Sequence, residues 1–173
     1  FADRFPDNSF GASELQVGFG AIETLELEIA DGRSFDKSYA ADSAGINFMV
    51  NEAAVRALNL DEPIGEKLIW DDDEMRREGQ IIGVVKDFHF KSLHESIRPL
   101  IIQINPYDFT YFIIRLDGQQ FQKTLGEIEQ VYSKYETEKA FEYRFLDEQL
   151  ADLYENEVRT LNVFSSFAVI AVI

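Results

Sequence analysis

The chain has 173 residues, of which 46% are hydrophobic and 13% aromatic, enough for one sizeable domain or two small lobes, and this composition excludes disorder over most of its length. Its 32 acidic and 16 basic residues give a formal net charge of −16, which repels phosphate backbones and anionic lipid head groups, so we expect no nucleic-acid partner. The absence of cysteine excludes disulfides, thiol catalysis and cysteine-ligated zinc or iron–sulfur sites.

The first 45 residues alternate between turn-forming and apolar stretches without a long periodic run. We expect an irregular lead-in over 1–18, a short helix over 19–25, a strand near 26–30, a tight turn at Asp31-Gly32 and a loop over 38–45.

The next stretch has a clearer pattern. The apolar run Ile46–Val50 predicts a buried strand. Asn51 follows at an N-cap position, and Glu52 is well placed for the dipole of a short helix that ends around Asn59. A strand over 66–70 is expected after the turn residues that follow this helix.

The second half predicts a strand, a helix and a strand. A hairpin tip over 71–74, a long strand over 79–90 and a short strand at 101–102 come first. Alternation predicts a strand over 109–116, a stripe with steps of four and three predicts a helix over 121–135, and a further strand follows over 141–145. This order is typical of a βαβ unit.

The last element changes character along its length. Asp147 is a suitable N-cap, and charged residues occupy the polar faces of the expected helix up to Arg159. From Leu161 to Ile173 no charge remains, which predicts a helix that enters a membrane, although the run is shorter than the roughly 20 residues of a complete span. A buried amphipathic helix or a dimerisation helix is the alternative.

Two clusters have the residue types of metal sites. Asp87, His89, His94 and Glu95 are of the types that bind zinc, but their spacing matches no zinc motif. The acidic run 71–74 has hard oxygen ligands but lacks the spacing and the glycine of a calcium loop. Nucleophile-elbow and phosphate-loop motifs are absent. We therefore expect no catalytic, cofactor-binding or metal-binding residues, and no enzyme activity.

Several stretches together resemble the MacB-like periplasmic core domain of ABC-transporter permeases of the FtsX/MacB family. The similar segments are Asp31-Gly32-Arg33-Ser34-Phe35, Val50-Asn51-Glu52-Ala53-Ala54, Pro63-Ile64-Gly65, and Ile82 to His94 with Pro99-Leu100. Each motif is short, and their order and spacing are specific as a set.

The resemblance implies an α+β fold. It places the end of the first part of a porter-like βαβ lobe at 1–21, an inserted, smaller, mostly-β lobe at 22–98, the second part of the porter-like lobe at 99–146, and a stalk helix with the start of a transmembrane helix at 147–173. On this reading the first transmembrane helix and the first half of the domain are not included.

The function that the resemblance implies is mechanical. The domain would face the periplasm or cell exterior on the bacterial inner membrane and transmit ATP-driven helix motion for export or envelope processes. Its partners would be a cytoplasmic ABC ATPase, a second permease in a homodimer or heterodimer, and an envelope protein. The alternative is a ligand-sensing extracytoplasmic domain of a membrane receptor. The sequence does not indicate the substrate.

Overall fold

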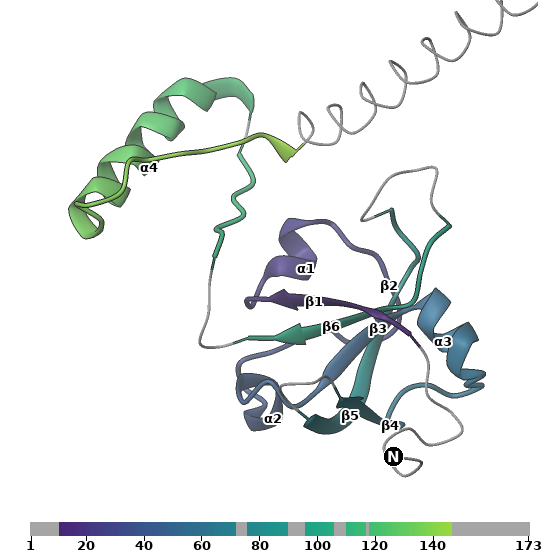
Figure 1. Cartoon of the computed structure of the whole chain (residues 1–173). Helices are drawn as coiled ribbons and strands as arrows, with labels where there is room; N and C mark the ends of the chain where they lie inside the picture. The colour runs from purple at the N-terminus through teal and green to yellow at the C-terminus, as the bar shows by residue number, and fades with distance from the viewer. Residues whose placement is uncertain (1–10, 72–75, 90–95, 106–109, 117, 147–173) are drawn as a thin grey trace, which may run out of the picture. The chain divides into compact units, whose positions relative to one another are not determined.

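The computed structural model in Figure 1 describes residues 11–71, 76–89, 96–105, 110–116 and 118–146. These residues divide into two compact units, and each is described by itself. Unit 1 contains the described residues up to Arg115, and unit 2 contains those from Leu116 onward. The chain is α+β, with a six-stranded mixed sheet and, within the described residues, four α-helices.

Unit 1 is built around the sheet, whose strand order is β1-β6-β3-β5-β2, with β4 paired to β5. The β1–β6 and β3–β5 pairs are parallel, and the other three pairs are antiparallel. Its elements are β1 (Ser13–Val17), α1 (Ala21–Thr24), β2 (Ile29–Gly32), α2 (Ala40–Ser43), β3 (Phe48–Asn51), α3 (Glu52–Leu58), β4 (Lys67–Asp71), β5 (Arg76–Val85) and β6 (Leu100–Ile104).

The core of unit 1 surrounds β3, the middle strand of the five-strand path. Phe48, Met49 and Val50 have no exposed surface, as expected for a strand covered on both faces. One face packs in a cluster that β3, α3, β4, β5 and β6 share: Phe48, Val50, Ala54, Leu68, Ile81, Val84 and Ile101. The predicted buried strand is confirmed, although its hydrogen-bonded part begins at Phe48.

Unit 2 consists of a helix and an extended segment. A 3-10 turn, η1 (Gly118–Gln120), leads into α4 (Phe121–Tyr135), and the chain then runs back along the helix, as the yellow-green segment in Figure 1 shows. Aromatic rings hold the segment to the helix: the Phe121 and Phe145 centroids are 5.2 Å apart, and those of Tyr132 and Phe141 are 5.5 Å apart. The predicted helix is confirmed.

Two predicted loops contain regular structure. Residues 13–17 form β1 because β6 gives them a parallel partner, with Leu15 opposite Ile102. The region 38–45 contains α2, a single helical turn. Both elements are too short for periodicity to reveal them.

The predicted strand and turn near residue 30 are displaced. Asp31 and Gly32 belong to β2, whose register against β5 shifts between Ile29 and Asp31. Gly32 has a φ of 73°, so the pair bends an edge strand where a tight turn was expected.

Two predicted strands lie outside the sheet. Residues 110–116 and 141–145 have no strand pairing within the described chain, so neither completes the predicted βαβ unit. Tyr111 and Phe112 are 84% and 85% exposed. Alternation predicted the first strand, and the second was expected to follow the helix, but a strand exists only when another strand supplies its hydrogen bonds.

Candidate functional site

The N-terminus of α3 bonds segments that lie 31 to 49 residues away in the sequence. Asn51 ends β3, and its side-chain oxygen accepts hydrogen bonds from the Ala54 amide at 3.0 Å and the Leu100 amide at 2.9 Å. Its side-chain nitrogen donates to the Arg98 carbonyl at 3.0 Å. The predicted N-cap is confirmed, and the same buried side chain also fixes the start of β6.

Asp87 follows the end of β5 and contacts the same helical turn. One carboxylate oxygen accepts a hydrogen bond from the Ala53 amide at 2.9 Å, and the other pairs with Arg56 at 2.5 Å. In return, the Glu52 carboxylate accepts from the Asp87 amide at 3.1 Å. The predicted strand over 79–90 therefore ends at Val85, because the backbone of Asp87 bonds a side chain of α3 instead of a strand.

Electrostatics favour this arrangement. The carboxylates of Glu52 and Asp87 lie at the positive end of the α3 dipole. The hydrogen bond to Asp87 raises the pKa of Arg56 above its ordinary value. The Arg56 side chain is 64% exposed, whereas that of Asp87 is 16% exposed, so the backbone bonds to Asp87 stabilise the site more than the ion pair does.

We call Asn51, Glu52, Arg56 and Asp87 the α3 clamp. Through it, one turn of helix holds the chain where it leaves β5 and where it enters β6. Lys86 connects the same region to the residue that precedes β2. Its amide donates to the Glu28 carbonyl, and its side chain pairs with the Glu28 carboxylate. The clamp therefore resists displacement of the segment after β5 and of the segment before β6 relative to the sheet.

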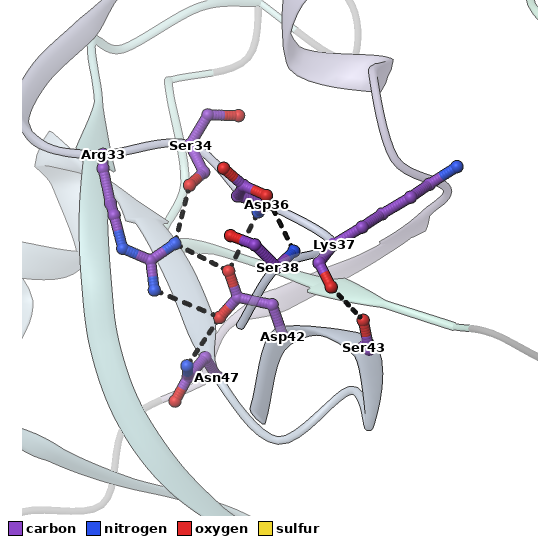
Figure 2. A network of polar contacts seen from close by, with 8 residues as sticks. All are labelled: Arg33, Ser34, Asp36, Lys37, Ser38, Asp42, Ser43 and Asn47. Carbon is purple, nitrogen blue, oxygen red and sulfur yellow. Dashed lines mark hydrogen bonds and ion pairs between the residues drawn. The ribbon is translucent and has the colours of Figure 1, made fainter. Parts of the chain in front are cut away.

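A second polar network surrounds Asp42, as Figure 2 shows. Arg33 donates to both of its carboxylate oxygens, at 2.6 and 3.3 Å. Asn47 and the Asp36 amide donate to the same carboxylate at 2.6 and 2.9 Å. The Asp42 side chain is completely buried, and the Arg33 guanidinium also lies 3.9 Å from the centre of the Tyr39 ring.

The pKa of Asp42 reflects two opposing effects. Burial alone would raise it, but the hydrogen bonds from Arg33, Asn47 and the Asp36 amide together outweigh burial and lower the pKa below its ordinary value of 3.8. The carboxylate is thus ionised and fully hydrogen-bonded, which holds the segment between β2 and β3 together. No sequence pattern indicated this network; the only signal was an acid among small residues at 40–44.

The residues considered as metal ligands, for which no site was expected, do not form a group in the described residues. Asp87 belongs to the α3 clamp, His89 is exposed, and His94 and Glu95 lie outside the described residues. Where the structure describes the chain, no group of three potential ligands could hold a metal ion. Residues 72–74 of the acidic run also lie outside it.

The comparisons with known proteins leave the family open. No family model matches the chain, and no curated protein matches it. Within the part of the chain that the structure describes, no helix has the length and apolar character needed to cross a bilayer. The expected membrane-entering helix over 147–173 lies outside the described residues.

Proposed function

We propose that this chain is a non-catalytic extracytoplasmic domain of an ABC-transporter permease of the FtsX/MacB type, which transmits ATP-driven motion of membrane helices. The α3 clamp is the observation that supports it best. Asn51 and Glu52 come from one of the family-like segments and Asp87 from another, and the clamp bonds the two segments directly. The residues behind the resemblance therefore have a shared structural role.

The chemistry of the clamp favours a mechanical role over binding of a small ligand. Its acceptors and donors bond the chain's own backbone at Ala53, Asp87, Arg98 and Leu100. Groups that are already hydrogen-bonded have little to offer a ligand. Hydrogen bonds that fix α3 to the neighbouring segments suit an element that moves as a rigid body. In this proposal, unit 2 belongs to the second part of the porter-like lobe (99–146), and the inserted lobe (22–98) supplies β2 to β5 of unit 1.

The experiment follows the distance between the two units in the full-length protein, purified in complex with the ABC ATPase that the proposal requires. This chain has no cysteine. Once any cysteine elsewhere in the full-length protein is replaced, the substitutions Glu62→Cys in unit 1 and Gln130→Cys in unit 2 place spin labels at two exposed positions. We expect the label distance to change between the nucleotide-free and vanadate-trapped states. An unchanged distance in a complex that hydrolyses ATP would refute transmission.

Two further variants test the clamp itself. Asp87→Ala should broaden the distance distribution and weaken its response to trapping, because the Ala53 amide and the Arg56 guanidinium both lose their acceptor and the segment after β5 is no longer bonded to α3. Glu78→Ala is the matched control, since it removes an exposed carboxylate that pairs with the exposed Lys67. An equal effect of both variants would contradict a specific role for the clamp. If the full-length protein binds no ATPase and responds instead to an added small molecule, the receptor alternative is correct.

A further inference from the structure

The segment after α4 has a strand-like sequence and structure but no partner strand in the described chain. Residues 141–145 have the sequence Phe-Glu-Tyr-Arg-Phe. The rings of Phe141, Tyr143 and Phe145 form a row, with successive centroids 5.9 and 5.6 Å apart. The two outer rings pack on α4. Rings at every second residue on one side are the pattern of a β-strand.

The opposite side of this segment is charged. Alternation places Glu142 and Arg144 away from the rings, and both are exposed. Neither forms an ion pair with another described residue. The segment therefore has one face covered by a helix, one face with two opposite charges, and no backbone pairing to the described strands. Such an edge favours addition of another strand.

We propose that residues 141–145 pair antiparallel with the same residues of a second copy of this chain, about a two-fold axis through Tyr143. The reason is charge complementarity. In this register Glu142 lies opposite Arg144 of the second copy, and Arg144 lies opposite its Glu142. Phe141 and Phe145 also face each other across the pair. A two-fold interface requires a surface that is complementary to itself, and this five-residue sequence has that property.

The charges also select the register. A shift of two residues in either direction places Glu142 opposite Glu142 or Arg144 opposite Arg144 on the axis, and parallel in-register pairing brings both like-charged pairs together. Like charges directly opposite each other destabilise a sheet. A shift of one residue turns the rings to the charged face. Antiparallel pairing about Tyr143 is thus the arrangement that satisfies both faces.

The two helices strengthen the case for a second copy over a foreign strand. Val131 and Tyr135 on α4 are 53% and 88% exposed, and Tyr143 is 52% exposed. Two-fold pairing puts both copies of α4 on the same face of a two-stranded sheet, where these apolar groups gain a partner. A two-stranded sheet alone is marginal in water, but one covered by helices is not. This proposal does not depend on the permease assignment.

Charge reversal on the full chain tests the proposal, and sedimentation equilibrium measures the dissociation constant of the dimer. The measurement is made at moderate salt, because the net charge of −16 opposes association at low salt. We expect Glu142→Arg and Arg144→Glu each to weaken association by about tenfold or more, because each changes two symmetric pairs. An equimolar mixture of the two variants should associate again, and so should the doubly exchanged variant E142R/R144E.

The controls and the refuting results follow from the same logic. Glu62→Arg and Lys37→Glu make the same changes of charge at exposed positions of unit 1, and we expect them to leave association unchanged. Tyr143→Cys should form a disulfide-linked dimer on oxidation, because it lies on the axis, whereas Gln130→Cys should not. A wild-type chain that stays monomeric, or association that is insensitive to the charges at 142 and 144, would overturn the proposal.

Discussion

Removal of the charge on Asp42 should destabilise unit 1 strongly. Asp42→Asn keeps one acceptor oxygen but replaces the other with a donor that faces Arg33 or Asn47. A hydrogen bond to a charged group contributes about 1.5–3 kcal/mol when buried. The Asn47 side chain is buried, whereas that of Arg33 is 34% exposed, so the contribution of the Arg33 pair must be reduced for solvent screening. We expect a loss of about 2–3 kcal/mol in the free energy of unfolding.

Trp70 makes the assay specific to unit 1. It is the single tryptophan of the chain, and it packs against the apolar cluster around β3. Urea denaturation followed by tryptophan fluorescence therefore reports the unfolding of unit 1. Asp61→Asn, at an exposed position after α3, is the control with the same change of charge. If Asp42→Asn stays within about 0.5 kcal/mol of this control, the network is not a source of stability and the reasoning is refuted.

The same carboxylate gives a prediction about pH. Because the folded-state pKa of Asp42 lies below its ordinary value, folding favours the ionised form. Its contribution is fully present above the unfolded-state pKa, near 4, and is lost as pH falls through the folded-state value. We expect the free energy of unfolding to fall as pH drops below about 4, and Asp42→Asn should reduce this slope. An identical slope in the variant would contradict the assignment.

Three further substitutions test the clamp and the core. Asp87→Ala should cost about 1–2 kcal/mol and speed hydrogen exchange at the Ala53 amide, because that amide loses its acceptor. Gly79→Ala should lower the free energy of unfolding by more than about 3 kcal/mol in urea denaturation, because the new Cβ would lie 1.8 Å from the Ile46 carbonyl oxygen. In the control Gly126→Ala, the new Cβ in α4 meets nothing within 4 Å, and the substitution should raise helix stability by about 0.5–1 kcal/mol. Gln103→Met should stabilise unit 1 by about 1–2 kcal/mol, measured as a higher urea midpoint, because the buried Gln103 amide has no hydrogen-bond partner in the described chain.

Local signals in the sequence were enough for elements whose partners lie within a few residues. The cap at Asn51 and the end of α3 around Asn59 depend on the helix itself, and both are confirmed. The helix α4 was predicted from its apolar stripe alone. In each case the interaction that ends or orients the element is made by a neighbour along the chain.

Long-range pairing was beyond prediction from one sequence. Asn51 bonds Arg98 and Leu100, which lie 47 and 49 residues away, and the pattern around Asn51 indicated only a helix cap. Likewise, β1 exists because β6 lies beside it. The α3 clamp needs three segments to meet. Its residue types predicted the start of a helix, but not the contacts between these segments.

The two segments wrongly predicted as strands of the described chain differ in the side chains on their two faces. Residues 110–116 alternate between two apolar faces, and the described structure holds their end through Arg115, which bonds the Thr24 carbonyl and pairs with Glu26. Residues 141–145 have one apolar and one charged face, and α4 already covers the apolar one. Only the second segment carries two opposite charges on one face, and these specify a partner and a register. The alternation of rings and charges along 141–145 is therefore the property that makes its self-pairing specific.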